Sequence, residues 1–448
     1  MSTDLLAFLS GKRLLRTEIP YPDAELDPLI EKGLINKSPS ILFKKSLPLC
    51  IRCGNADRSL FASHFCATCQ KNCLYCRHCI GLGKTQECKP LYQVPTSNHT
   101  TYPTLESPLN WEGKLSPAQQ KASLAVISTI QQKRSILLWA VCGAGKTEML
   151  FEGISAALER GERVLLATPR VDVVKELTPR FRKAFPTVTI ASLYGGSKDH
   201  HTQAPFVIAT THQVMRFYES FDVVIIDEVD AFPFSYDKSL QYAITQARKS
   251  HSALIYLTAT PTANLKKQKD LTTIYIPRRY HGFPLPVPNF HWCGNWRARL
   301  KKNKLPSVLL KWLSDRQLTA KPTLLFVPSV QLLHECSTIL QSLAIKHEAV
   351  HAADTDRHNK LDAFRNNEYS LLVTTTILER GVTIPHVDVA VLGAEDDVFT
   401  EAALVQIAGR VGRSADAPTG DVTFFHYGRT DAMLRARGQI NWMNKREV

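Results

Sequence analysis

The sequence has 448 residues, of which 44% are hydrophobic and 21% charged, the balance of a soluble globular protein rather than a disordered one. At roughly 100–200 residues per domain, this length favours two or three domains. Lys and Arg outnumber Asp and Glu by 55 to 41, and this excess points to a polyanion such as nucleic acid or anionic lipid. No uncharged apolar run reaches the ~20 residues of a membrane span, and the start lacks the pattern of a signal peptide. These features argue against a secreted, fibrous or integral membrane protein.

The first 92 residues consist of an extension, residues 1–48, and a cysteine-rich segment, residues 49–92. The extension mixes charges and shows no strong periodicity. The second segment holds eight of the eleven cysteines: Cys50, Cys53, Cys66, Cys69, Cys73, Cys76, Cys79 and Cys88. An unexported chain occupies a reducing compartment, where a disulfide framework is not expected. Because C-x2-C pairs supply the thiolates of tetrahedral zinc sites, we expect residues 49–92 to form a zinc module.

The spacing leaves the sharing of these eight thiolates open. A sequential arrangement would group Cys50, Cys53, Cys66 and Cys69 against the rest. A nested arrangement would enclose Cys66, Cys69, Cys73 and Cys76 within the outer four. A third possibility is one zinc on Cys50, Cys53, Cys76 and Cys79, with other cysteines free. An iron–sulfur cluster is an alternative to zinc. The segment carries six Lys or Arg against two acids, so the module could touch DNA or dock a protein.

Residues 93–110 are rich in Pro, Ser, Thr and Asn and read as a linker. From about Trp111, short apolar runs alternate with amphipathic stretches, the pattern of parallel sheets flanked by helices. The alternation breaks near four prolines between 277 and 288 and resumes after residue 304. We therefore expect two tandem α/β domains, at 111–278 and 305–448, joined by a connector at 279–304.

A phosphate-binding loop follows the first buried run of the first α/β domain. Its expected phosphate-contacting residues are Ala140, Gly143, Ala144, Gly145, Lys146 and Thr147. Backbone N–H groups of such a loop and of the following helix point at phosphates, and glycines allow the close approach. Lys146 would reach the β- and γ-phosphates of ATP, and Thr147 would place its hydroxyl on Mg²⁺.

A second motif strengthens this interpretation. The apolar run FDVVII ends in Asp227 and Glu228. Asp227 at a strand end would bind Mg²⁺ through water, and Glu228 would orient and deprotonate the attacking water. The alternative is a solvated acidic turn, and the intact phosphate loop in the same domain argues against it.

The order of further motifs resembles that of a superfamily 2 helicase, whose two RecA-like domains close on ATP. Gln119, in LSPAQ, resembles the glutamine that reads adenine. Thr168–Arg170 and Thr210–Gln213 resemble strand-contacting motifs, and Thr258–Thr260 resembles motif III. Thr374–Gly381 resembles motif V, in which Gly381 would contact the nucleotide. Gln406–Arg413 resembles motif VI, which implies a catalytic role for Gln406 and arginine fingers at Arg410 and Arg413.

Two features resemble the ComFA-type late competence proteins of Gram-positive bacteria. The multi-cysteine module precedes the motor, and the carboxylate motif reads DEVDAFPF, which is neither DEAD nor DEAH. The resemblance implies a cytoplasmic ATPase, at most peripheral at the membrane, that drives import of single-stranded DNA during natural transformation. It also implies three partners: a ComFC-type phosphoribosyltransferase-like protein, the uptake channel and a recombination mediator.

Other functions remain open beside this one. A PriA-like helicase of replication or repair is the nearest rival, although its cysteines interrupt the motor. A DNA-stimulated ATPase that remodels protein complexes and a non-catalytic docking protein are the other two. Thr383 stands where many relatives carry an acid in motif V, which puts that residue's ribose or coupling contact in doubt.

The segment from Lys266 to Lys304 is a candidate DNA contact. It holds ten Lys or Arg and one acid, and six aromatic residues are interleaved with them: Tyr275, Tyr280, Phe283, Phe290, Trp292 and Trp296. Single-strand binders combine a basic groove with aromatic stacking platforms. The alternative is a solvated basic connector whose aromatic side chains pack on the domains.

Overall fold

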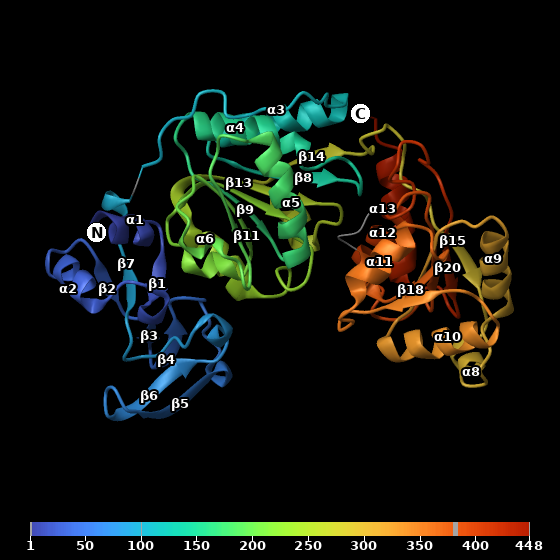
Figure 1. Ribbon diagram of the computed structural model, residues 1–448, viewed down its shortest axis with the longest axis horizontal. Coiled ribbons are helices and arrows are strands. Elements are labelled where there is room, and N and C mark those ends of the chain that lie inside the picture. Colours follow the sequence, from blue (N-terminus) through green and yellow to red (C-terminus); the bar gives the residue numbers. More distant parts are fainter. Residues whose placement is uncertain (1, 100, 380–383, 448) are drawn as a thin grey trace. The chain divides into compact units, whose positions relative to one another are not determined.

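A computed structural model describes residues 2–99, 101–379 and 384–447 (Figure 1). The chain divides into two compact units, and each is described by itself. The first unit comprises Met1–Lys114, Lys121–Leu138 and Thr147–Ile274. The second comprises Leu115–Gln120, Trp139–Lys146 and Tyr275–Val448.

The N-terminal region is a folded layer, whereas the sequence suggested an extension without strong periodicity. Its elements are α1 (Ser2–Leu9), β1 (Arg13–Leu15), α2 (Asp23–Glu31), β2 (Asn36–Ser38) and β7 (Leu91–Gln93). Strand β7 lies between β1 and β2 and pairs antiparallel with both. Leu5, Leu9, Leu26 and Tyr92 form part of a common core. The cysteine-rich segment is therefore an insertion between two neighbouring strands of one sheet, and residues 1–48 do not fold apart from it.

Two hairpins lie between β2 and β7, and the first begins before the cysteine-rich segment expected at residues 49–92 (Figure 1). They are β3 (Ile41–Lys44) with β4 (Leu47–Cys50), and β5 (Phe61–Cys66) with β6 (Lys71–Cys76). The β5–β6 register pairs Phe61 with Cys76 and Cys66 with Lys71. Cys76 thus lies at the open end of this hairpin and Cys66 at its turn. The two cysteines are therefore at opposite ends of the hairpin and lie near different cysteines.

A seven-stranded sheet of order β10-β11-β9-β12-β13-β8-β14 carries the phosphate loop and the carboxylate motif. Its strands are β8 (Ser135–Ala140), β9 (Val164–Thr168), β10 (Ile190–Leu193), β11 (Phe206–Thr210), β12 (Phe221–Asp227), β13 (Arg248–Thr258) and β14 (Thr272–Ile276). The pairings of β10 with β11, β11 with β9, β9 with β12 and β12 with β13 are parallel. Strands β9 and β11 are buried along their whole length, as expected for a parallel sheet covered on both faces.

Helices connect these strands in the alternation that the sequence predicted. They are α3 (Pro117–Gln131), α4 (Phe151–Glu159), α5 (Val171–Ala184), α6 (Lys238–Ala247) and α7 (Ala263–Lys267). Asp237 caps α6 by accepting a hydrogen bond from the backbone N–H of Ser239, and ten residues separate the end of β12 from the start of this helix.

The second unit contains a six-stranded sheet of order β15-β20-β19-β16-β18-β17, parallel at each pairing. Its strands are β15 (Asn289–Trp292), β16 (Thr323–Phe326), β17 (Glu348–Val350), β18 (Leu371–Thr374), β19 (Asp388–Leu392) and β20 (Val422–His426). Its helices are α8 (Trp296–Leu300), α9 (Ser307–Leu318), α10 (Val330–Ser342), α11 (Arg357–Arg365), α12 (Glu401–Ala408) and α13 (Asp431–Asn444).

The connector expected at 279–304 is part of this second fold. Strand β15 is an edge strand of the six-stranded sheet, and Trp296 of α8 is only 1% exposed within its core. The prolines that interrupted the sequence pattern precede β15 and so mark the entry to the sheet. Across the described ranges, no helix is both long enough and apolar enough to cross a bilayer.

Candidate nucleotide and metal sites

The phosphate loop follows β8 directly, as predicted. Its backbone takes positive φ values at Gly143 (80°) and Gly145 (68°), which side chains with a Cβ rarely adopt. Thr147 is 8% exposed, and a 3-10 turn and α4 continue from it. The loop thus has the strand–loop–helix context that phosphate binding by backbone N–H groups requires.

Gln119 braces the loop within the second unit. Its Nε2 donates to the carbonyl of Ala144 at 2.9 Å, and its Oε1 accepts from the backbone N–H of Ser116 at 2.8 Å. The side chain is 5% exposed. The adenine contact expected of Gln119 stays a prediction, but its placement on the loop is a finding.

The carboxylate motif lies at the end of β12, beside the end of β13. Asp227 pairs in register with Leu257, and the N–H of Glu228 donates to Asp227 Oδ1 at 2.9 Å. Glu228 has a φ of 53°, a left-handed conformation that is strained for a side chain with a Cβ and is concentrated at functional sites.

Asp230 is a candidate functional residue to which the sequence analysis assigned no role. Its carboxylate accepts from the hydroxyl of Thr260 at 2.6 Å and from the hydroxyl of Thr258. Both threonines belong to the Thr258–Thr260 motif at the end of β13. Asp230 therefore links the carboxylate loop to motif III, and a third acid three residues after Asp227 was the available signal.

The two motifs expected to contact a nucleic-acid strand also lie together. Thr168 ends β9 and Thr210 ends β11, its parallel neighbour in register. The N–H of Thr211 donates to the carbonyl of Thr168 at 3.0 Å. Their carboxyl ends share one edge of the sheet, as motifs that bind one strand would require.

Motif VI lies at the end of α12 in the second unit. Arg410 is 3% exposed, and its Nε donates to the carbonyl of Glu379 at 2.9 Å. Arg413 is partly exposed and bonds the carbonyl of Gly409. Gln406 accepts from the thiol of Cys142 at 3.1 Å. Gly381 and Thr383 of motif V lie outside the described residues.

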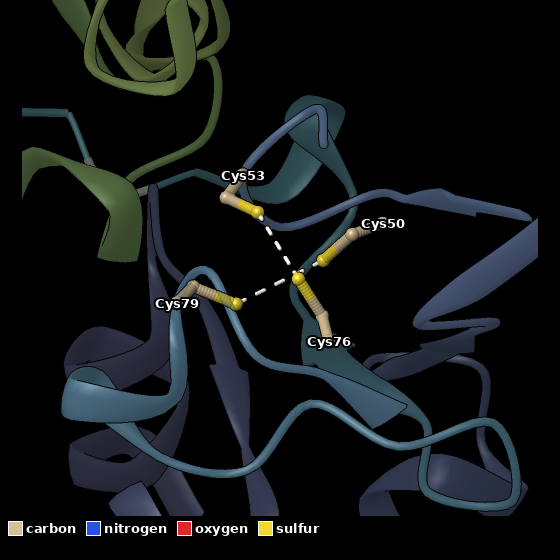
Figure 2. A group of neighbouring side chains, drawn as sticks. All are labelled: Cys50, Cys53, Cys76 and Cys79. Carbon is tan, nitrogen blue, oxygen red and sulfur yellow. Dashed lines mark hydrogen bonds between the residues drawn. The ribbon is translucent and has the colours of Figure 1, made fainter. Parts of the chain in front are cut away.

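The first cysteine cluster consists of Cys50, Cys53, Cys76 and Cys79, all buried. Figure 2 shows the four side chains converging, and Cys50 and Cys76 end strands β4 and β6 while Cys53 and Cys79 follow three residues later. The Cys53 and Cys76 sulfur atoms are 3.7 Å apart, and those of Cys50 and Cys79 are 3.9 Å apart. Tetrahedral zinc with bonds of ~2.3 Å would set sulfur atoms about 3.8 Å apart, so the cluster fits zinc. Hydrogen bonds from the Cys50 and Cys53 thiols lower the pKa of Cys76, which favours the thiolate form.

The second cluster consists of Cys66, Cys69, Cys73 and Cys88. The Cys66 and Cys88 sulfur atoms are 3.7 Å apart. A hydrogen bond from the backbone N–H of Cys69 lowers the pKa of Cys66 to about 6, so one ligand is readily ionised. Neither the sequential nor the nested grouping corresponds to these clusters. The first matches the four cysteines of the one-zinc alternative, and the remaining four form a second site of their own.

The first cluster packs against the motor through α6. Its cysteines share a hydrophobic core with Leu240 and Ile244. Tyr242 donates its hydroxyl to the carbonyl of Ile51 at 3.2 Å, and its ring fills the space beside Gly54, where an added Cβ would come within 2.6 Å. His78 Nε2 lies 3.3 Å from Asp237, the cap of α6. The cluster thus supports the helix that follows the carboxylate loop.

The candidate DNA segment separates into packed and exposed parts. Trp296 is buried, and Phe290 stacks on Phe424 at 5.9 Å. Trp292, by contrast, is 66% exposed. Other exposed members are Tyr280, Phe283, Arg299, Lys301, Lys302 and Lys304. Arg297 pairs with Glu395 and Asp396. Part of the expected surface therefore remains available to a strand, and part is structural.

Comparison with known proteins identifies the family. The competence protein ComFA N-terminal domain family matches residues 1–93. The type III restriction enzyme res-subunit family matches residues 112–263, and the helicase conserved C-terminal domain family matches residues 301–415. The competence protein ComFA of Bacillus subtilis is 46% identical over 447 residues, covering 99% of this chain and 96% of the relative.

The chain belongs to the competence protein ComFA family. ComFA of Streptococcus pneumoniae is 36% identical over 420 residues, covering 93% of this chain and 94% of that protein. The motor fold is also similar to that of S. cerevisiae Dbp5, with a TM-score of 0.52, 16% identity and coverage of 74% of this chain and 92% of Dbp5. The comparison with Mycobacterium smegmatis Lhr gives a TM-score of 0.53 and 18% identity, and it covers 73% of this chain and 50% of Lhr. This ComFA chain is therefore a competence-related helicase-type ATPase with two RecA-like domains.

Proposed function

We propose that this ComFA protein is an ATP-driven translocase on single-stranded DNA that imports transforming DNA across the cytoplasmic membrane during natural competence. Family membership over 99% of the chain supports the competence role. The observation that carries the motor role is the bond between Asp230 and Thr260, because it joins the hydrolysis motif to the motif at the end of the next strand.

The hydrolysis chemistry follows from the residues at the strand ends. Lys146 and the backbone of the phosphate loop bind the β- and γ-phosphates of ATP. Glu228 orients the attacking water and accepts its proton. Arg410 and Arg413 supply positive charge to the transition state, and Gln406 assists in positioning. Gln119 holds the phosphate loop and reads adenine.

The donor sets fit the expected metals. Thr147 and Asp227 would hold Mg²⁺, which supplies charge neutralisation at the phosphates when bound. The two cysteine clusters would each hold one Zn²⁺ in a structural role, since all four ligands of each are protein thiolates. In the first cluster this role includes support of α6.

Movement along DNA follows if loss of the γ-phosphate shifts the Asp230–Thr260 pair and, through it, the motifs at Thr168 and Thr211. The partners implied by family membership are a ComFC-type phosphoribosyltransferase-like protein, the uptake channel and a recombination mediator. The site of action would be the cytoplasmic face of the membrane.

The test is ATP hydrolysis by the purified protein with no nucleic acid, single-stranded DNA, duplex DNA or RNA, beside the Lys146→Ala variant. Strong stimulation by single-stranded DNA that disappears in the variant supports the proposal. A preference for forked duplex would favour the PriA-like alternative, and a preference for RNA would contradict a role in DNA import. Absence of hydrolysis under every condition would favour a docking role for the zinc module.

A further inference from the structure

A cavity of about 280 Å³ lies within the first unit, between the N-terminal region and the seven-stranded sheet. One side is formed by residues around β1, including Lys12 and Leu14, and the other by residues that follow β10 and β11, including His200 and Arg216. None of these residues belongs to the nucleotide motifs or to the cysteine clusters. The volume is close to the lower end of the ~300–1,000 Å³ range of small-molecule sites.

Lys12 is the residue that distinguishes this cavity. It is only 6% exposed, and its ammonium group has no hydrogen-bond partner among the residues that the structure describes. The ammonium lies 4.1 Å from the centre of the Phe8 ring. The backbone of Lys12 forms a bridge with Phe217, so the residue is fixed where the N-terminal region meets the motor. Burial and the nearby Arg163 and Arg216 lower the pKa of Lys12 to about 7.

Glu18, which lines the cavity, and Asp199, which precedes the lining residue His200, are already paired with other groups. Glu18 accepts from Arg52 at 2.6 Å and from Arg216 at 2.8 Å. Asp199 accepts from Arg182 at 3.2 Å and from the N–H of Ser192 at 2.9 Å. Burying a cation without a counter-ion is unfavourable. The cavity therefore has positive charge that an anion would balance.

The apolar lining of the cavity indicates that the anionic group belongs to a larger, partly apolar ligand. Phe8, Leu14, Leu193 and Phe217 give the cavity apolar lining beside its charged groups. A free inorganic anion would leave this lining unused. A phosphate ester that carries a ring would place its phosphate near Lys12 and Arg216 and its ring against the apolar lining.

We propose that this cavity binds a small phosphate ester of the mononucleotide class, either as a free nucleotide or as the phosphorylated end of a DNA strand. Lys12 and Arg216 are its phosphate contacts, and His200 lies beside them. The ligand joins the N-terminal region to the motor, since its contacts come from both. The proposal does not depend on the motor function and concerns residues that the motor motifs do not use.

The test is calorimetric titration of thymidine 5′-monophosphate into the full chain, with the phosphate loop already saturated by a non-hydrolysable ATP analogue. Thymidine without phosphate and inorganic phosphate are the matched probes. We expect the monophosphate to bind at least tenfold more tightly than either probe. Lys12→Met should weaken it by tenfold or more, whereas Lys32→Met, at an exposed position after α2, should leave it unchanged.

A second variant protects the test against a folding defect. Thr17 lines the cavity and is exposed, so Thr17→Trp should block entry without altering charge or core. Absence of monophosphate binding by the wild-type chain, or binding by Lys12→Met and Thr17→Trp as tight as that of the wild-type chain, overturns the proposal. Oligonucleotides with and without a terminal phosphate then separate the two sources. A Lys12-dependent preference for the phosphorylated strand assigns the strand end, and equal binding assigns the free nucleotide.

Discussion

Thr260 donates its hydroxyl to the carboxylate of Asp230 at 2.6 Å, and Thr258 donates to the other oxygen of the same carboxylate. These bonds join the loops that follow two neighbouring parallel strands, β12 and β13. Glu228, the expected base, lies two residues before Asp230. We expect these bonds to transmit a change in the carboxylate loop during hydrolysis to motif III.

Replacing Asp230 should reduce the ATP hydrolysis that single-stranded DNA stimulates. Each bond to the carboxylate is worth roughly 1.5–3 kcal/mol, and without both the carboxylate loop is no longer tied to the Thr258–Thr260 motif. We expect Asp230→Ala to lower the single-stranded DNA-stimulated ATPase rate by at least tenfold. Glu176→Ala, on the exposed face of α5, is the matched control. Equal stimulated rates in the two variants would show that the link is not used.

The two cysteine clusters should bind two zinc ions of unequal lability. Metal analysis should give two zinc ions per chain, and one in either Cys53→Ser or Cys69→Ser. The first cluster is buried against α6, whereas Cys69 and Cys88 of the second are partly exposed. A chelator should therefore remove zinc from the second cluster first, and Cys53→Ser should lower the unfolding temperature more than Cys69→Ser.

Cys336→Ala, at a buried position in α10, serves as the control and should keep both ions. A single zinc in the wild-type protein, or iron in place of zinc, would contradict the assignment.

Stability should depend on pH through Lys12. Its pKa is about 7 in the folded chain against 10.5 for the free side chain. The unfolded state therefore binds more protons between these values, and the free energy of unfolding should rise as pH increases from 7 towards 10.5. Below pH 7 the full penalty of the buried charge remains. Lys12→Met should increase stability by roughly 1–3 kcal/mol at pH 7 and reduce this slope.

Chemical denaturation at pH 7 and pH 9 measures the effect, with Lys32→Met as the control. If the free energy of unfolding of Lys12→Met depends on pH as steeply as that of the wild-type protein, the Lys12 side chain is exposed to solvent and the prediction is wrong.

The basic segment should contribute to strand binding through its exposed members. Arg299, Lys301 and Lys302 are exposed, whereas Arg297 is paired with acids. Replacing the first three with glutamine should flatten the salt dependence of single-stranded DNA affinity by about 2 in log–log slope. Adding Arg297→Gln should change little. An unaltered salt dependence would show that these side chains are solvated and do not contact the strand.

The two tryptophans of this segment should behave differently. Trp292 is exposed and donates its Nε1 proton to the carbonyl of Tyr427 at 3.2 Å, so its ring is held available for stacking. Trp292→Ala should weaken strand affinity by about tenfold, since a base stack is worth roughly 1–3 kcal/mol. Trp296→Ala should instead destabilise the fold by about 3–5 kcal/mol. Binding and unfolding measurements on both variants separate the two roles.

Candidate sites could be located from the sequence most reliably where they consist of contiguous residues. The phosphate loop and the Asp227–Glu228 pair could be located because a buried strand and its following turn are written in one stretch. The cysteine grouping could not be predicted in the same way. It depends on the β5–β6 register, which sends Cys73 and Cys76 to different clusters, and three residues along a strand span about 10 Å.

Pairing between distant segments explains the other differences. Strand β7 joins β1 and β2 from the far side of the cysteine-rich segment, so residues 1–48 showed no pattern by themselves. Strand β15 has only four residues and pairs with β20 at the end of the chain. Asp230 was missed because its role appears only when β12 and β13 lie side by side.

The most direct test of the account is movement along a single strand. Oligonucleotides carrying biotin at the 5′ or the 3′ end are blocked with streptavidin and incubated with the protein and ATP, beside Glu228→Gln. We predict ATP-dependent displacement of streptavidin from one of the two ends, and none by the variant. DNA-stimulated hydrolysis without displacement from either end would contradict translocation and would favour an ATPase that remodels a protein complex.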